Sequence, residues 1–352
     1  MIAGRVNVYD SGVPSQPTIS AGNNHAISPS RDSFRRNRRR LLLSHAATAQ
    51  TVFPNKPITI IVPAAAGGPT DTVARLIGES MGRTLGQTIL VENVGGAGGT
   101  LGMARVSKSP ADGYTLAVWH IAHATAPALY DSIRYDVVND FDHLGRITDV
   151  PMTLVSRSTL AANNVTELLQ WIRTSSDKAV YGHAGIGSAS HLCMLMLMKE
   201  LGVQMNGIPY RGTGPAMNDL LSGQFDVMCD QTTNTTNQIK EGKIKGFAVT
   251  TKSRVSSLPE LPTLDAEAVK GFEVSAWHAL WAPQGLPKEV ADKLVAALQA
   301  ALKDPKVIER FANLGTEPVQ AELATPAALK AHLAAEVPRW GAVIKAAGAK
   351  GN

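Results

Sequence analysis

The chain repeats one pattern, in which a short β-branched run is followed by a loop of small residues and then by apolar residues at helical spacing. The first example has its apolar run at Ile58–Val62, its loop at 64–71 and its helical pattern at 73–85. A second strand is predicted at 88–91, so 57–92 reads as one β-α-β unit. Units of this kind predict a parallel sheet whose strands are connected by helices.

The pattern continues along the rest of the chain. Two sets of units, each with small-residue loops at its strand ends, predict two α/β lobes that face each other across a cleft. In each lobe we expect a mainly parallel sheet with helices on both faces. Further strands are predicted at 114–118, 179–182, 207–210, 225–228 and 246–250, and helices at 102–107, 165–174, 192–201, 216–221, 288–302 and 326–347.

Composition narrows the class of protein. A chain of 352 residues with 44% hydrophobic residues can bury a sizeable core and is expected to form about two domains. It contains no run of 18 apolar residues, which argues against an integral membrane protein. The net charge of +5 comes from the arginines of residues 1–50, whereas basic and acidic residues balance over 51–352. We therefore expect no nucleic-acid partner for the folded part.

Residues 1–50 differ from the rest of the chain. Up to about residue 34 they show neither a strand nor a helix period, and we interpret them as disordered. The next segment follows the order of a secretory signal, with a basic region at Arg35–Arg40, an apolar region at Leu41–Leu43 and small residues at Ala47–Ala49. Its apolar region is short, since a signal normally has about 7–15 apolar residues. We interpret this segment as a degenerate export signal, and a disordered basic tail remains the alternative.

Metal and thiol chemistry have little support. Cys193 and Cys229 allow one disulfide and lack zinc-site spacing, and we interpret both as buried core thiols. His120 and His123 stand three residues apart, but no carboxylate or cysteine pair lies near them in the sequence. We interpret them as loop histidines at a strand end, and expect no metal.

The glycine clusters do not match a nucleotide-binding or catalytic motif. The segments 96–101 and 185–190 both lack the third glycine of G-x-G-x-x-G. The chain also lacks the P-loop, the H-E-x-x-H zinc motif and the G-x-S-x-G nucleophile elbow. We therefore expect no cofactor and no enzymatic activity.

The small-residue loops instead suit an anion. Helix N-termini at the carboxyl ends of parallel strands present free N–H groups and a partial positive charge, so they can hold a carboxylate without lysine or arginine. Asp71 is interpreted as an acid of a helix's first turn rather than a general base. Arg211 either pairs with a ligand carboxylate or lies in solvent. His191 either donates to an anion or packs, and Asp230 either contacts a polar group of the ligand or makes a structural hydrogen bond.

Several motifs resemble those of the substrate-binding proteins of tripartite tricarboxylate transporters, the Bug or TctC-like family. The resemblance spans about residues 52–350, with the motifs in order. They are PITIIVPAAAGGPTD at 57–71, VEN at 91–93 with its glycine-rich sequel, DGYTL at 112–116, YRGTGPA at 210–216, GQFDVM at 223–228 and LWAP at 280–283.

The resemblance implies a periplasmic binding protein of the Venus-flytrap type, which closes on a small mono-, di- or tricarboxylate and delivers it to a membrane permease. It implies one lobe from 52–151 together with 276–352 and a second from 152–275, and we expect a monomer. The alternatives are a cytoplasmic ligand sensor and an enzyme acting on a small organic acid.

The resemblance also implies which loops line the cleft. Asp230, an acid at a strand end, is a further candidate ligand-binding residue. Three residues depart from the family pattern: Ala64 replaces the usual Phe, and Trp119 and His120 are bulky where small residues are usual. The implied ligand-binding residues are Ala65, Ala66, Gly67, Gly68, Pro69, Thr70, Asp71, His123, Ala124, Gly187, Ser188, Ala189, Ser190, His191, Arg211, Gly212, Thr213 and Pro215.

Overall fold

The computed structural model describes residues 52–346 and 348–351, which belong to one compact unit, Gln50–Asn352. The expectations for residues 1–50 fall outside this part of the chain. Among the described residues, no helix combines the length and apolar character that a membrane span requires.

One set of parallel strands forms from the first β-α-β units. In β1 (Ile58–Val62) four of the five side chains are buried, as its β-branched run predicts. β1 pairs in parallel with β2 (Ile89–Asn93) and β3 (Thr115–His120). The associated helices are α1 (Pro69–Leu85), α2 (Thr100–Ser107) and α3 (Ala122–Leu129), and a 3-10 turn, η1, spans Ala97–Gly99.

A second set of parallel strands lies later in the chain. β5 (Val180–His183) pairs in parallel with β6 (Asn206–Pro209) and β7 (Val227–Gln231). The helices of this part are α4 (Val165–Ser175), α5 (Ala189–Leu201), α6 (Thr213–Leu221), α7 (Thr232–Lys240) and the short α8 (Leu264–Glu267).

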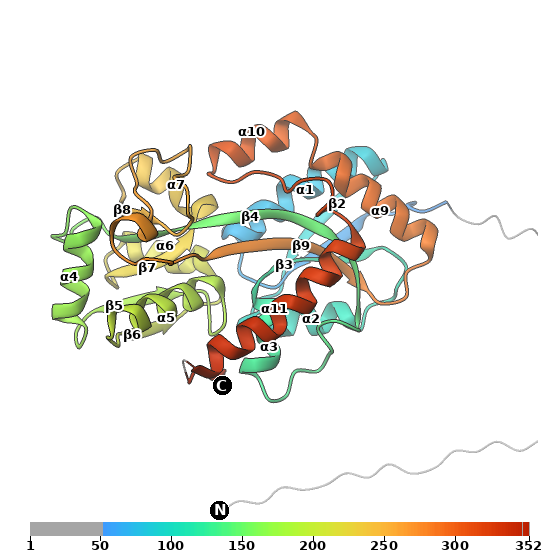
Figure 1. Ribbon diagram of the computed structural model, residues 1–352. Helices are drawn as coiled ribbons and strands as arrows, with labels where there is room; N and C mark the ends of the chain where they lie inside the picture. Colours follow the sequence, from blue (N-terminus) through green and yellow to red (C-terminus); the bar gives the residue numbers. More distant parts are fainter. Residues whose placement is uncertain (1–51, 347, 352) are drawn as a thin grey trace, which may run out of the picture. The chain divides into compact units, whose positions relative to one another are not determined.

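Two long strands join the two sets. β4 (Phe141–Arg157) pairs antiparallel with β9 (Ser275–Pro283) over its first part and with β7 and β8 (Ile244–Val249) over its last part. The strand order is β2-β1-β3-β9-β4-β7-β5-β6, with β8 also on β4. Figure 1 shows β4 and β9 running side by side from one half of the unit to the other. The two parallel sets are confirmed, and the antiparallel strands between them are an addition to the prediction.

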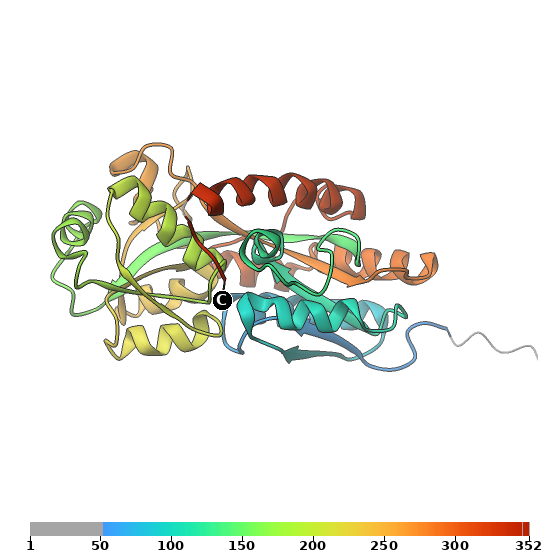
Figure 2. The ribbon, with the colours of Figure 1, turned by 90° about the horizontal axis from the view of Figure 1, so that it is seen from below.

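The C-terminal helices support the long strands. They are α9 (Lys288–Ala301), α10 (Pro305–Asn313) and α11 (Pro326–Ala346). Figure 2 shows α11 on one side of β4 and β9, and α11 contacts both β4 and α3.

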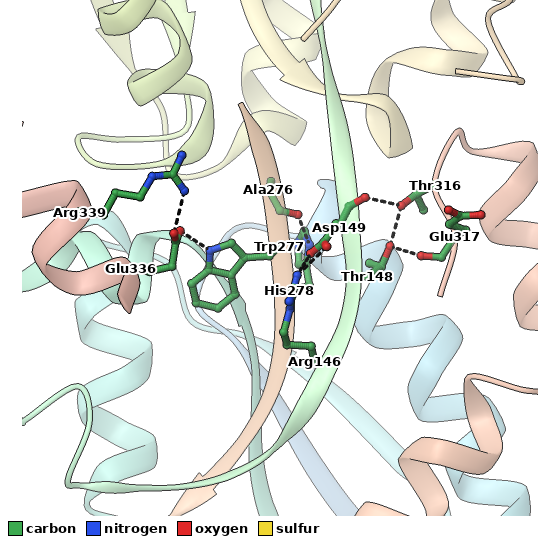
Figure 3. Close-up of polar contacts among 10 residues, drawn as sticks. All are labelled: Arg146, Thr148, Asp149, Ala276, Trp277, His278, Thr316, Glu317, Glu336 and Arg339. Carbon is green, nitrogen blue, oxygen red and sulfur yellow. Dashed lines mark hydrogen bonds and ion pairs between the residues drawn. The ribbon is translucent and has the colours of Figure 1, made fainter. Parts of the chain in front are cut away.

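Polar contacts fasten the middle of β4 and β9 to the C-terminal segments (Figure 3). The Thr148 hydroxyl donates to the carbonyl of Glu317 at 2.7 Å and accepts from the Thr316 hydroxyl at 2.6 Å. On β9, the indole N–H of Trp277 donates to the buried Glu336 of α11 at 2.9 Å. The stretch of each strand that lies between the two halves is therefore held by side chains from the C-terminal part.

Two sequence-based expectations are corrected. Cys193 of α5 and Cys229 of β7 are both buried, but they form a disulfide because the helix packs directly against the strand with the two Cα atoms 6.1 Å apart. His123 lies within α3 rather than in a loop, since the segment after β3 turns directly into a helix. The elements β4, β9, α3, α7 and α10 are also absent from the prediction.

Candidate functional site

A small cavity lies where the loops of the two parallel sets meet. The space inside it that can hold the centre of a water molecule is about 20 Å³, room for about one water. We call its two sides the first wall and the second wall. The first wall comprises Ala64, Pro69, Thr70, Trp119 and His120, and the second comprises Ala184, Ser188, Ala189, Ser190, Gly212, Thr213, Asp230 and Gln231.

Four helix N-termini meet at this cavity. α1 begins at Pro69 and α5 at Ala189, while the cap residues of α6 and α7 are Gly212 and Gln231. All of these residues line the cavity. Each helix start adds a partial positive charge, so the site favours an anion although no lysine or arginine is among its lining residues.

Free backbone donors accompany these helix starts. In α1 the first amide that donates to a backbone carbonyl in the helical pattern is that of Thr72, to the carbonyl of Gly68. In α5 it is the amide of Leu192, which donates to the carbonyl of Ser188. The earlier amides of Thr70, Ala189 and Ser190 have no backbone acceptor in the described part of the chain. The two walls therefore both offer N–H groups to a ligand.

The polar groups of the first wall are already paired. His278 lies behind Thr70, and its Nδ1 lies 3.2 Å from the carbonyl of Ala276, which can only accept. Nε2 of the neutral ring is therefore an acceptor, and the Thr70 hydroxyl donates to it at 3.1 Å. Burial lowers the pKa of His278 to about 3, so the ring stays neutral at physiological pH.

His120 follows the same logic. Its Nδ1 accepts a hydrogen bond from the Ala122 amide at 3.1 Å, which places the proton of the neutral ring on Nε2. Burial, with a smaller effect of the neighbouring His278, holds the pKa of His120 well below its usual range. The first wall thus contains neutral imidazoles with defined tautomers.

The serines of the second wall bind each other. The Ser188 hydroxyl donates to the carbonyl of Gly185 at 2.7 Å, so in the 3.1 Å contact with Ser190 it acts as the acceptor. The Ser190 hydroxyl also accepts from the Ala184 amide at 2.9 Å. These side chains fix the turn before α5 and leave the backbone amides as the donors toward the cavity.

Asp230 is the exception in the second wall. Its Oδ2 accepts from the side-chain amide of Asn234 at 2.6 Å, whereas its buried Oδ1 has no hydrogen-bond partner among the described residues. Burial raises the pKa of Asp230 to about 7, against the opposing effects of Asn234, the Gln231 backbone and, most weakly, the Thr213 side chain. The adjacent Gln231 likewise has a buried Oε1 without a partner in the described part of the chain.

The walls touch each other around the cavity. The Ala65 amide of the first loop donates to the carbonyl of Arg211 at 2.8 Å, and the Thr125 hydroxyl of α3 donates to the carbonyl of Gly187 at 3.0 Å. A Cβ atom on Gly214 would lie 2.8 Å from the carbonyl oxygen of Ala66. The structure is therefore a closed arrangement, in which glycine permits the backbones to approach.

The structure brings many of the sequence-predicted residues together. Those that line the cavity are Pro69, Thr70, Ser188, Ala189, Ser190, Gly212, Thr213 and Asp230.

Other predicted residues lie beside the cavity rather than in it. Asp71 accepts from the Gly67 amide at 3.0 Å and pairs with Arg75, and despite burial these contacts and Asn93 hold its pKa below the usual value. Arg211 is exposed and contributes its carbonyl group. The remaining residues of the predicted loops outside the lining are Ala65, Ala66, Gly67, Gly68 and Pro215.

The predicted residues His123, Ala124, Gly187 and His191 form supporting contacts. His123 is fully buried, and its ring stands 5.0 Å from the rings of Phe141 and Trp281. His191 accepts from the Gly187 amide through Nδ1 at 3.1 Å, and burial, with a smaller effect of His183, lowers its pKa to about 3. Neutral and internally bonded, His191 stabilises the turn before α5.

The structure adds lining residues to the predicted set. Ala64 and Trp119 were noted only as departures from the family pattern, and His120 also as a histidine at a strand end. Ala184 and Gln231 were not predicted. The available signal was position, because each lies at the carboxyl end of a strand or directly after it. Across the described residues, no group of three His, Cys, Asp or Glu side chains is placed to hold a metal ion.

The chain is similar to a known family and to curated proteins. The model of the tripartite tricarboxylate transporter family receptor, TctC, matches residues 73–349. A UPF0065 protein from the TAR-I ttuE-ttuC' intergenic region of Agrobacterium vitis is 51% identical over 87% of this chain and 89% of its own length.

Two solved structures are also similar. The periplasmic binding protein BugD is 50% identical, with a TM-score of 0.83 over 85% of this chain and 99% of its own. MatC from Rhodopseudomonas palustris, solved with bound malate, is 38% identical, with a TM-score of 0.79 over 83% of this chain and all of its own. The fold is thus the two-lobed α/β fold of periplasmic binding proteins, and the chain belongs to the tripartite tricarboxylate transporter receptor family of solute-binding proteins.

Proposed function

We propose that this chain is an extracytoplasmic receptor that binds a small carboxylate between its two walls and delivers it to a tripartite tricarboxylate transporter permease. The observation that carries the proposal is the meeting of four helix N-termini at one buried cavity whose lining residues include no basic side chain. Such a site compensates a carboxylate with backbone amides and helix dipoles. The malate bound to the related MatC supports the same ligand class.

The ligand enters by a hinge motion. Because the cavity has room for about one water, an organic acid enters only after the walls separate. We place one lobe at 52–151 with 276–352 and the other at 152–275, so that the hinge lies where β4 changes partner from β9 to β7 and β8. The permease would then recognise the closed form.

The binding residues follow from the two walls. In this proposal the amides of Thr70, Ala189 and Ser190 hold carboxylate oxygens, and Gly212 and Thr213 close the site from α6. The loop residues 65–68 and the backbone of Arg211 hold the walls together. Catalysis would need a nucleophile with a base or a bound metal. We assign neither to this cavity and therefore propose a receptor without turnover.

Native mass spectrometry of the full chain and a thermal-shift screen against mono-, di- and tricarboxylates test the ligand class. An acid that binds one to one, remains chemically unchanged and raises the melting temperature with concentration supports the receptor. Conversion of the acid would identify an enzyme, and the lack of any carboxylate ligand would contradict the proposal. Fractionation of cells expressing the full chain distinguishes a periplasmic receptor from a cytoplasmic sensor.

A further inference from the structure

A buried acid without a partner is unexpected in a site built for anions. Asp230 is 0% exposed, and its Oδ1 has no hydrogen-bond partner among the described residues. An unpaired buried acceptor is costly, so such a group in a native protein calls for an explanation. Asp230 also lines the cavity, so the unpaired oxygen belongs to the site where the ligand is proposed to bind.

The orientation of the Asp230 carboxylate is fixed by its other oxygen. Asn234, one helical turn further along in α7, donates its side-chain amide to Oδ2 at 2.6 Å. The neighbouring Gln231 adds a second buried acceptor, Oε1, without a partner in the described part of the chain. The second wall thus presents acceptors beside the backbone donors of α5.

The first wall cannot provide the missing donor through Thr70. The Thr70 hydroxyl already donates to His278, which accepts through Nε2 because Nδ1 faces a carbonyl. A ligand whose carboxylate meets the amides can satisfy Asp230 if it also carries a hydrogen-bond donor.

Resting on the proposed function, we propose that Asp230 Oδ1 accepts a hydrogen bond from a hydroxyl or ammonium group of the ligand, so that the receptor selects small carboxylates that carry such a donor. Asp230 is a specificity residue in this arrangement. An unsubstituted diacid binds through the same helix N-termini but brings only a like charge toward Asp230.

Three four-carbon acids test the proposal: succinate, L-malate with a hydroxyl group and L-aspartate with an ammonium group. A hydrogen bond to a charged acceptor corresponds to roughly a 10- to 100-fold difference in Kd. The wild-type receptor is therefore expected to bind malate or aspartate at least about tenfold more tightly than succinate. Isothermal titration calorimetry at pH 7.5 measures all three Kd values.

The substitution Asp230→Asn reverses the polarity of the group. The new carbonyl can accept from Asn234 as Oδ2 does, and the new NH2 group then replaces the free acceptor with a donor. We expect D230N to lose the preference for malate or aspartate while succinate binds within about threefold of the wild type or more tightly. D292N, the same chemical change at an exposed site on α9, is the control and is expected to keep the wild-type preference.

Proton exchange gives a measurement that needs no variant. With malate or aspartate bound, Asp230 is ionised, so titration near pH 7 in two buffers of different ionisation enthalpy should show proton release, and succinate should show uptake. The lining histidine His120 and the nearby His278 and His191 stay neutral at this pH, which leaves Asp230 as the titrating group of the cavity.

The two proposals fail in different ways. Three results would each overturn the role of Asp230 and leave the receptor function intact. They are equal binding of succinate and the substituted acids by the wild type, an equal loss of affinity for all three acids in D230N, and identical proton exchange for all three acids. If neither these acids nor any other carboxylate of the screen binds to the wild type, the receptor function itself is wrong.

Discussion

The two walls of the cavity differ in whether their buried side-chain acceptors have hydrogen-bond partners. His120 of the first wall and His278 behind it are neutral, and each accepts a hydrogen bond, from the Ala122 amide and from the Thr70 hydroxyl. In the second wall Asp230 and Gln231 leave acceptors without partners among the described residues. Buried side-chain acceptors without a partner therefore lie in the second wall, and a ligand with a donor group would complete their hydrogen bonds.

Buried histidines in both halves make stability depend on pH, and acid should produce the largest effect. The pKa values of His123, His191 and His278 are lowered by burial to about 3 and that of His183 to about 4, from an ordinary value of 6.5. Below pH 6.5 the unfolded chain binds protons that the folded chain excludes, so the free energy of unfolding falls as pH falls.

Relative to pH 8, each of these histidines lowers the free energy of unfolding at pH 5.5 by about 1.4 kcal/mol, or by roughly 6 kcal/mol for four. Urea unfolding at pH 8 and 5.5 measures the loss, and the ligand-free D230N variant shows it without the opposing titration of Asp230. A free energy of unfolding that is flat over this range would contradict the neutral histidines.

Asp230 gives the second-largest effect, with the opposite sign. Its pKa of about 7 lies above the ordinary 3.8, so the folded protein binds the proton more tightly than the unfolded chain does. The free energy of unfolding is therefore expected to fall as pH rises from about 4 to 7 and then to level off, by at most about 4 kcal/mol. In D230N this fall should disappear, so the variant gains stability relative to the ligand-free wild type at pH 8. Equal stability of the two proteins at pH 8 would mean that the buried carboxylate has another partner.

The comparison of walls also shows what the sequence predicts and what it does not. The β-α-β pattern predicts both parallel sets, and β1 is found at the predicted residues. It does not predict α7, whose segment TTNTTNQIK consists mostly of poor helix formers. This helix is stabilised by tertiary contacts, since the hydroxyls of Thr232 and Thr236 donate to the carbonyls of Gly315 and Leu314.

The limits at the site have a similar cause. The family resemblance implies that Ser188–Ser190 and Gly212–Thr213 line the cleft, and loop composition is consistent with this, because small residues at helix starts suit an anion. It does not distinguish a lining residue from its support: His191 and Asp71 lie in equally suitable first turns, yet they turn back to bond their own loops. That distinction depends on how two loops distant in sequence pack together, which leaves no local pattern.

Removal of the disulfide should destabilise the folded protein. The bond between Cys193 and Cys229 ties the start of α5 to β7 next to Asp230, across 36 residues of chain. The double variant C193A/C229A is expected to lose about 3 kcal/mol of unfolding free energy, mainly because its unfolded state is less constrained. Urea unfolding of the oxidised wild type and the variant measures this, and reductant should affect only the wild type. An unchanged midpoint would show that the two thiols are not paired in solution.

The smallest effect concerns the contact between the walls. A Cβ atom on Gly214 would lie 2.8 Å from the carbonyl oxygen of Ala66 and 3.2 Å from the amide nitrogen of Gly68, atoms of the opposite loop. Because these contacts exist only when the walls meet, Gly214→Val should oppose closure and weaken ligand binding roughly 10- to 100-fold while leaving the melting temperature of the separated form nearly unchanged.

The matched control for this variant is Gly341→Ala in α11, where an added Cβ meets nothing within 4 Å. Calorimetric titration of both variants with the acid identified in the screen measures the difference. If G214V binds as tightly as G341A, the ligand-bound form is more open at α6 than the closed arrangement described here. The amides of α5 and the Asp230 carboxylate would then bind the ligand without a contribution from α6. The second wall would in that case consist of a ligand-binding part, α5 and Asp230, and a part that contacts the opposite loop, α6.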